Sequence, residues 1–167
     1  MISKVDYCNS KLTGISGHLM DRLQSVLNSA ALLILSARRT DHITHLLRQF
    51  HWWRVLERIP FRLCGLAYCC LYGTAPPYLA ESLHLTTDVT DRCHLRSADS
   101  LTLLVSPTLR PSLGDRAFPV AAPRAWNKLP SSVRTASSLP VFHRDLKTML
   151  LRLSFDWKCM YINCYYI

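Results

Sequence analysis

The chain has 167 residues, 49% of them hydrophobic, and a formal net charge of +9 at pH 7. This length and apolarity exclude a wholly disordered chain and allow one modest core or two small helical subdomains. The positive charge favours an anionic partner, either nucleic acid or an acidic membrane surface. A basic globular protein without such a partner has the same composition, so charge alone leaves both interpretations open.

The seven cysteines show no paired C-x-x-C spacing, and the N-terminus lacks the apolar segment of a secretory signal. We therefore expect an intracellular, reduced chain without disulfides. The longest apolar runs fall well short of the roughly 20 residues that a membrane-spanning helix needs. A membrane is accordingly not among the expected partners.

Residues 18–36 carry the clearest helical pattern, and Ser16 stands where an N-cap is expected. The apolar positions of this helix are predicted to form one inward stripe, made of Leu19, Leu23, Val26, Leu27, Ala30 and Ile34. A second helix is predicted to begin at a Thr40 cap. A third, amphipathic helix is predicted to end at Gly73, which suits a C-cap.

Tryptophans and arginines interleave around the predicted second and third helices. Trp52 and Trp53 could stack on bases while the arginines pair with phosphates, or they could be core aromatics beneath a solvated basic face. Arginine suits phosphate recognition because its planar fork donates two hydrogen bonds at once. The candidate nucleic-acid-binding residues are Arg38, Arg39, Arg48, Arg54, Arg58 and Arg62.

Histidines and cysteines do not form a metal-binding pattern. His42 and His45 lie one helical turn apart, but no cysteine or carboxylate follows in ligand spacing, so we interpret them as solvated histidines. Cys93 and His94 lack a second pair at zinc-finger spacing. No metal site, cofactor or small-molecule substrate is predicted.

The middle of the chain is predicted to contain a short helix, a loop and one strand. Prolines open a helix that ends near Leu83, and the polar, threonine-rich residues 84–100 indicate a loop and a subdomain boundary. Residues 101–106 carry the one clear strand signal. Because one strand cannot make a sheet, this segment must pair with an unpredicted strand or lie extended on the helices.

Residues 113–130 contain a second helical pattern with an aromatic anchor. Gly114 and Asp115 are predicted to start this helix, with Pro119 in its first turn and Pro123 kinking or ending it. The apolar positions are Phe118, Ala121, Ala122, Ala125 and Trp126. A short helix over 131–134 and a final helix after Ser138 are predicted to follow, the latter with an apolar face of Leu139, Phe142, Leu146, Met149, Leu150 and Leu153.

The order of residues in the 113–130 block, G-D-R-A-F-x-x-A-A-P-x-x-W-N-x-L-P, resembles the C-terminal region of non-LTR (LINE-type) retrotransposon reverse transcriptases. Further blocks resemble that family in the same order over residues 5–153. They are D-Y-C-N at 6–9, L-Q-x-V-x-N-x-A-A at 23–31, D-H-I-T at 41–44, A-P-x-Y-L at 75–79 and S-L-x-x-F at 138–142.

The resemblance implies a thumb and C-terminal region, which in this family grips template and product while the chemistry happens elsewhere. The chain carries no aromatic-Ala-Asp-Asp turn to hold the catalytic metals, and no G-x-S-x-G elbow or phosphate-binding loop. We therefore expect a non-catalytic fragment with nonspecific RNA or DNA binding. The alternatives are an inert or protein-interaction remnant that self-associates through an exposed apolar face, and an enzyme whose palm is encoded upstream.

The predicted fold class is mainly α, with a small thumb-like bundle and at most one or two short strands in a loop-rich C-terminal region. The predicted boundaries are a thumb-like helical bundle over 1–83, a linker over 84–100, a C-terminal helical region over 101–154, and an unrelated, disordered tail over 155–167.

Overall fold

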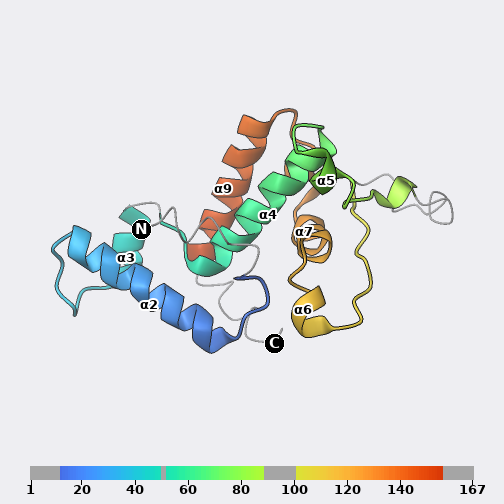
Figure 1. The fold of residues 1–167 in the computed structure, drawn as a ribbon. Coiled ribbons are helices and arrows are strands. Elements are labelled where there is room, and N and C mark those ends of the chain that lie inside the picture. Colours follow the sequence, from blue (N-terminus) through green and yellow to red (C-terminus); the bar gives the residue numbers. More distant parts are fainter. Residues whose placement is uncertain (1–11, 50–51, 89–100, 156–167) are drawn as a thin grey trace. The chain divides into compact units, whose positions relative to one another are not determined.

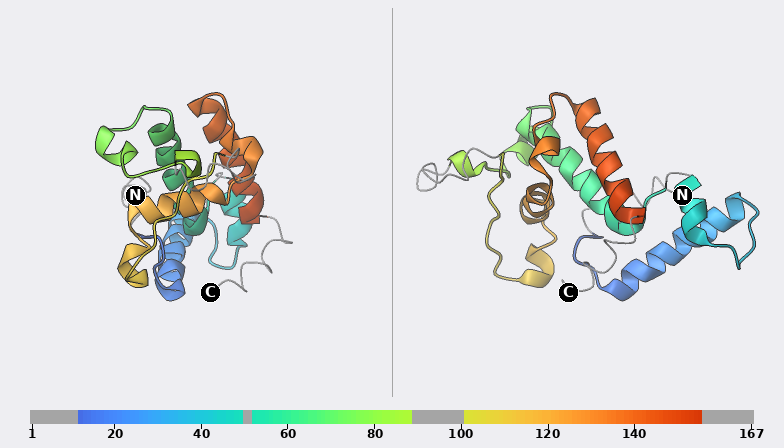
Figure 2. Two further views of the ribbon diagram at one scale, coloured as in Figure 1. Left: turned by 90° about the vertical axis from the view of Figure 1, so that its right-hand side faces the viewer. Right: turned by 180° about the vertical axis from the view of Figure 1, so that it is seen from behind.

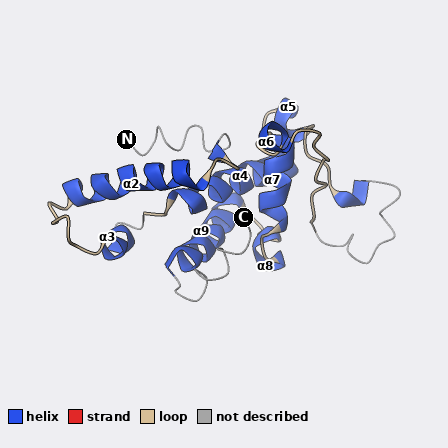
Figure 3. Cartoon of the chain, turned by 90° about the horizontal axis from the view of Figure 1, so that it is seen from below, coloured by secondary structure: helices blue, strands red, loops and turns tan. Residues whose placement is uncertain are grey.

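A computed structural model of the chain describes residues 12–49, 52–88 and 101–155 (Figure 1). These residues are mainly α-helical, and Figure 3 shows helix and loop but no strand among them, which confirms the predicted fold class. No described helix is both long and apolar enough to cross a membrane. The predicted N-terminal block, most of the predicted linker and the predicted tail beyond Phe155 lie outside the described residues.

The chain divides into two compact units, and each is built from separate stretches of sequence. Unit 1 comprises Met1–Gly14 and Ile59–Leu146, and unit 2 comprises Ile15–Arg58 and Lys147–Ile167. The long helices α4 (Val55–Leu71) and α9 (Leu139–Phe155) each contribute to both units.

This division differs from the boundary predicted at residues 84–100, since the residues on both sides of that segment belong to unit 1. There, Leu85 and Leu103 form an antiparallel bridge. Composition marks the polar segment as a loop, but contacts between residues distant in sequence decide which parts of the chain share a core.

Unit 2 contains α2 (Gly17–Ile34), α3 (Ile43–Gln49) and the first turn of α4. Figure 2 shows α3 beside α2, with which it packs. Leu27 and Ala31 of α2 and Leu47 of α3 are buried, so the helix predicted over 18–36 is confirmed.

The inward stripe predicted for α2 is wrong in part. Leu19, Val26 and Ile34 are exposed by 46%, 54% and 60%. The physical reason is that α3 has only 7 residues and covers the side of α2 that carries Leu27 and Ala31. The apolar pattern predicts the helix, but the length of its neighbour decides which apolar residues are covered.

Of the two predicted N-caps, one is confirmed in position and one is wrong. Ser16 is the N-cap residue of α2 and its carbonyl accepts from the amides of Leu19 and Met20, but its side chain makes no capping hydrogen bond. Thr40 does not cap α3, which begins at Ile43. Instead, the carboxylate of Asp41 accepts a hydrogen bond from the Arg38 amide at 2.8 Å and closes the preceding turn.

The core of unit 1 is an aromatic cluster where α4, α7 (Phe118–Asn127) and α9 meet, and α4 and α9 lie side by side in Figure 1. The ring of Phe142 stacks on Tyr68 at a centroid distance of 4.6 Å and on Trp126 at 5.6 Å. Tyr68 also donates a hydrogen bond to the Ala136 carbonyl. Cys64 is fully buried in this unit, and burial raises the pKa of its thiol to about 12.

Helix α4 ends as predicted. Gly73 adopts a φ of +70°, a conformation that favours glycine, and the Thr74 amide donates to the Cys69 carbonyl at 2.9 Å. This is the hydrogen bond of a Schellman C-cap. Pro60 lies inside α4 without ending it.

The start predicted for α7 is wrong. Gly114 ends α6 (Pro111–Gly114), and the N-cap of α7 is Ala117. The carboxylate of Asp115 does not cap α7 but has two other partners. It accepts a hydrogen bond from the Thr108 hydroxyl at 2.9 Å and forms an ion pair with Arg124 at 3.0 Å.

The prolines of α7 behave in two ways. Pro119 occupies the first turn as predicted, whereas the helix continues past Pro123 to Asn127. Pro123 is itself buried, and packing around it outweighs the hydrogen bond that its missing N–H cannot make. The apolar face is confirmed, since Ala121, Ala122 and Trp126 are buried.

The segment predicted as a strand, residues 101–106, is extended and forms hydrogen bonds on both sides. On one side, the Leu104 amide donates to the His84 carbonyl, and the Thr86 amide donates to the Thr102 carbonyl. On the other side, Trp126 Nε1 donates to the Leu101 carbonyl at 2.6 Å. The segment therefore bridges one neighbouring stretch and lies against α7, which combines the two arrangements expected from the sequence.

The remaining predicted helices are present. They are α5 (Pro77–Ala80), α8 (Ser131–Arg134) and α9, which begins directly after Ser138. A short 3₁₀ turn, η2 (Thr86–Asp88), was not predicted. Within α9, Phe142, Leu146 and Leu150 are buried as expected, whereas Leu153 is 45% exposed.

Candidate nucleic-acid interface

Unit 2 holds the larger excess of positive charge. Its described residues include eight arginines and lysines against three carboxylates, whereas those of unit 1 include seven against four. Several unit 1 arginines also hold the fold together. Arg116 donates to the Gly14 carbonyl, Arg124 pairs with Asp115, and Arg134 donates to Thr102. The basic side chains of unit 2 are therefore the better candidates for an external anion.

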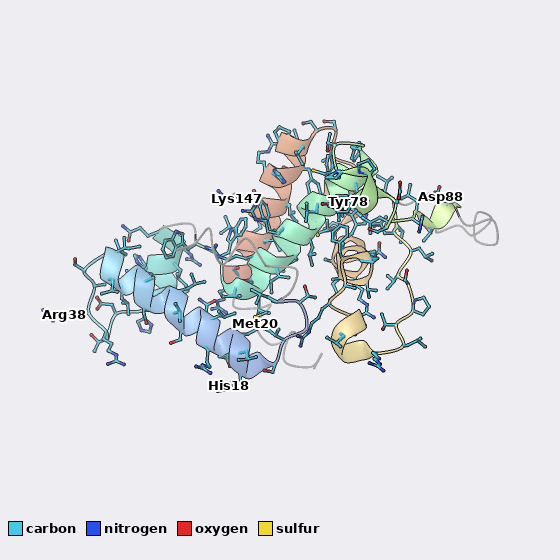
Figure 4. The ribbon with its side chains drawn as sticks, in the orientation of Figure 1. His18, Met20, Arg38, Tyr78, Asp88 and Lys147 are labelled. Atoms are coloured by element: carbon cyan, nitrogen blue, oxygen red, sulfur yellow. The ribbon has the colours of Figure 1, made fainter. Side chains whose placement is uncertain are left out.

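Arg38 and Arg39 are both exposed in the turn between α2 and α3, and Figure 4 labels Arg38 there. Among the residues that the structure describes, no acceptor takes a hydrogen bond from either guanidinium group. Arg48 is exposed on α3, the helix that follows this turn. These three predicted site residues are exposed, and an exposed guanidinium group can reach a phosphate.

The other three predicted arginines are placed differently. Arg54 is half-buried immediately before α4, whereas Arg62 is exposed on the part of α4 that belongs to unit 1. Arg58 is only 7% exposed, and its Nε donates to the Trp53 carbonyl at 3.3 Å. Its guanidinium group thus braces the turn before α4, and so little of it is exposed that phosphate has poor access.

Trp52 and Trp53 are both half-buried. Their burial is intermediate between the two interpretations made from the sequence, exposed rings that stack on bases and aromatic rings of the core. The Trp52 amide donates to the Leu47 carbonyl at 2.8 Å, which ties this tryptophan pair to the end of α3. The aromatic rings therefore belong in part to the packing of unit 2.

A cavity of about 250 Å³ lies within unit 2, between α2, α3 and the start of α4. Its polar lining residues are Asp21, Gln24, Asn28, Thr44 and Arg54. The side-chain carbonyl of Gln24 accepts from the first amide of α4, at Val55, at 2.9 Å, and its NH₂ group donates to Asn28 Oδ1 at 2.8 Å. One glutamine thus joins two helices and orients the neighbouring asparagine.

Sequence reasoning missed this cavity, although a signal was present. Gln24 and Asn28 lie one helical turn apart, on the side of α2 that also carries the buried Leu27 and Ala31. Polar amides beside a buried stripe need hydrogen-bond partners or water, so they often mark a polar cavity. Which elements close that cavity depends on α3 and α4, whose placement the α2 sequence does not contain.

Glu57 in the first turn of α4 is half-buried, and its carboxylate oxygen Oε2 is buried. Burial raises its pKa above the ordinary value of 4.5, against the opposing effects of its own backbone, the Ser154 hydroxyl and Arg54. The oxygen Oε2 has no well-aligned hydrogen bond within the described ranges, and neither does the hydroxyl of Ser154. The ionised carboxylate of Glu57 therefore loses hydration on folding and gains too few hydrogen bonds in the protein to replace it.

We expect Glu57→Gln to stabilise the chain at neutral pH by about 1 kcal/mol. A raised pKa means that the folded state favours the protonated carboxyl, so stability is lost as pH rises above 4.5 through the folded-state pKa. The neutral amide avoids this loss. Thermal unfolding from pH 4 to 8 should show a gain for the variant that grows with pH. Exposed Glu81 supplies the control, since Glu81→Gln should give no such trend.

No group of three or more histidine, cysteine or acidic residues within the described stretches is arranged to hold a metal ion. His42 and His45 are both exposed beside the basic turn. Comparisons with protein-family models, with curated proteins and with solved structures gave no match.

Proposed function

We propose that unit 2 binds the phosphates of RNA or DNA without sequence preference, as the non-catalytic thumb and C-terminal region of a LINE-type reverse transcriptase would. The observation that carries this proposal is the exposed pair Arg38 and Arg39, followed by exposed Arg48 on the next helix. The charge excess of unit 2 and the resemblance of residues 5–153 support it. The proposal places the chain inside the cell, where both nucleic acids occur.

The test is fluorescence anisotropy of labelled single-stranded RNA and duplex DNA, titrated with the full chain at several salt concentrations. Binding should weaken steeply with salt, because each phosphate contact releases condensed counterions. Replacing Arg38, Arg39 and Arg48 by alanine should lower the slope of log affinity against log salt by roughly 2–3. An affinity that does not change with salt would contradict the proposal.

The control must remove the same charge from unit 1. Arg110, Lys128 and Arg144 are exposed there, so their triple alanine variant has the same net charge as the unit 2 variant. We expect this control to keep most of the affinity and nearly the whole salt slope. Equal losses in both variants would show that general charge, rather than the turn before α3, governs binding.

Self-association is the second candidate, and the exposed face of α2 favours it. Leu19, Val26 and Leu33 recur every seven residues and are exposed by 46%, 54% and 80%. Apolar residues at this spacing line one side of a helix and can pack against the same side of a second copy. Light scattering over a protein concentration series tests this, since a monomer at every concentration would exclude it.

A further inference from the structure

We infer that the cavity of unit 2 accepts one unpaired base of a single strand, so that the chain distinguishes single-stranded nucleic acid from duplex. This inference rests on the proposed phosphate binding and adds a substrate class to it. The cavity measures about 250 Å³, is open to solvent and is lined by α2, α3 and the start of α4. That is below the range of pockets for drug-sized ligands, roughly 300–1,000 Å³, and suits one small ring system.

The hydrogen-bond pattern leaves donors for a ligand in this cavity. Gln24 and Asn28 use their acceptor oxygens within the protein, since Oε1 of Gln24 accepts from Val55 and Oδ1 of Asn28 accepts from Gln24. No described residue accepts from Nδ2 of Asn28, and the Thr44 hydroxyl is likewise without a described partner. Two donor groups that line one cavity therefore have capacity for an edge that carries acceptors.

An acceptor lies in the same lining. The carboxylate of Asp21 forms no ion pair with a described residue and lines the cavity together with Asn28, two helical turns further along α2. A nucleobase carries both donors and acceptors along its edge, and carboxylate and amide side chains are the groups that pair with such edges. The carboxylate of Asp21 disfavours an anionic group beside it, whereas a neutral base edge can donate a hydrogen bond to it.

The remaining walls suit the apolar faces of a base and the phosphate beside it. Ile43 and Leu47 of α3 and Val55 and Leu56 of α4 line the cavity, and Met20, labelled in Figure 4, does so from α2. Arg54 adds a guanidinium group to the lining, which can pair with the phosphate that precedes or follows the bound base.

A duplex cannot use this site without an additional cost. A paired base must be unstacked and extruded before it reaches a pocket, whereas a single strand presents its bases freely. The exposed arginines Arg38, Arg39 and Arg48 would hold the backbone of either form. The cavity would then add affinity for the single strand alone.

The experiment compares three labelled probes of equal length with the full chain by anisotropy at one salt concentration. They are a single-stranded DNA, the same strand built from abasic sugar-phosphate units, and the duplex. We expect the natural single strand to bind about tenfold more tightly than the abasic strand or the duplex. Equal binding of the natural and abasic strands would overturn the inference and leave phosphate binding intact. Failure of every probe to bind would instead refute the proposed function.

Protein variants supply a second test. Asn28→Asp keeps the size of the side chain and its acceptor oxygen but replaces the donor by a carboxylate oxygen, so the preference for the natural over the abasic strand should disappear. Gln49→Glu adds the same charge at an exposed position at the end of α3, outside the cavity lining, and should keep the preference. An Asn28→Asp chain that has a native circular dichroism spectrum and retains the preference would contradict the inference.

Discussion

Replacing Trp126 by alanine is expected to lower the free energy of unfolding by about 3–5 kcal/mol. The indole is fully buried and stacks on Phe142, which in turn stacks on Tyr68, so its loss opens a cavity at the centre of unit 1. Its Nε1 also donates to the Leu101 carbonyl at 2.6 Å. Urea denaturation followed by far-ultraviolet circular dichroism measures the effect without relying on the tryptophan signal that the variant removes.

Two variants separate the contributions of packing and hydrogen bonding at this position. Trp126→Phe keeps an aromatic ring in the core and loses the N–H group, so we expect a smaller loss, about 1–2 kcal/mol. Phe142→Ala removes the shared stacking partner and should be comparable to the alanine variant at Trp126. A loss below 1 kcal/mol for Trp126→Ala would show that α7 does not anchor the core of unit 1.

Helix positions in this chain could be predicted from sequence where periodicity is strong and local. Helix α2 and the final helix α9 follow their apolar repeats, and Gly73 ends α4 as its conformational freedom allows. Helix starts were less predictable. Asp115 has the right chemistry for an N-cap, but Arg124 and Thr108 compete for its carboxylate from positions that local rules do not consider.

Burial was less predictable than helix position, because it depends on the neighbour. Arg58 appears equivalent to Arg54 and Arg62 in a helical repeat, yet it is buried against the Trp53 carbonyl. The exposed apolar side of α2 has the same cause, since α3 is too short to cover it. Thus the sequence predicts the six arginines alike, while the burial of Arg58 and the cavity beside Asn28 required the structure.

The strand signal at residues 101–106 shows the same dependence on distant partners. Its β-branched and apolar residues predict an extended segment, and Leu103 is indeed extended and 1% exposed. What pairs with it on one side is the side chain of Asn127, 24 residues further along. Sequence rules treat asparagine at the end of a helix as a stop signal, and they do not anticipate an amide that replaces a neighbouring strand.

Replacing Asn127 by alanine is expected to lower the free energy of unfolding by about 2–4 kcal/mol, because it leaves two buried backbone groups without partners. The side chain accepts from the Leu103 amide at 2.9 Å and donates to the Leu103 carbonyl at 2.8 Å, as a paired strand would. Hydrogen exchange should show faster exchange of the Leu103 amide in the variant, whereas the Thr86 amide on the opposite side should change less.

The Asn127→Asp variant tests whether the donor or the acceptor of that amide matters more. Its carboxylate still accepts from the Leu103 amide but places a second negative oxygen against the Leu103 carbonyl. We expect a loss at neutral pH at least as large as that of the alanine variant. Stability should return towards wild type as pH falls, because a protonated carboxyl can donate to the Leu103 carbonyl. If Asn127→Asp were as stable as wild type at pH 7, the donor bond would contribute nothing, and Asn127 would stabilise the segment only through the bond that its side-chain oxygen accepts from the Leu103 amide.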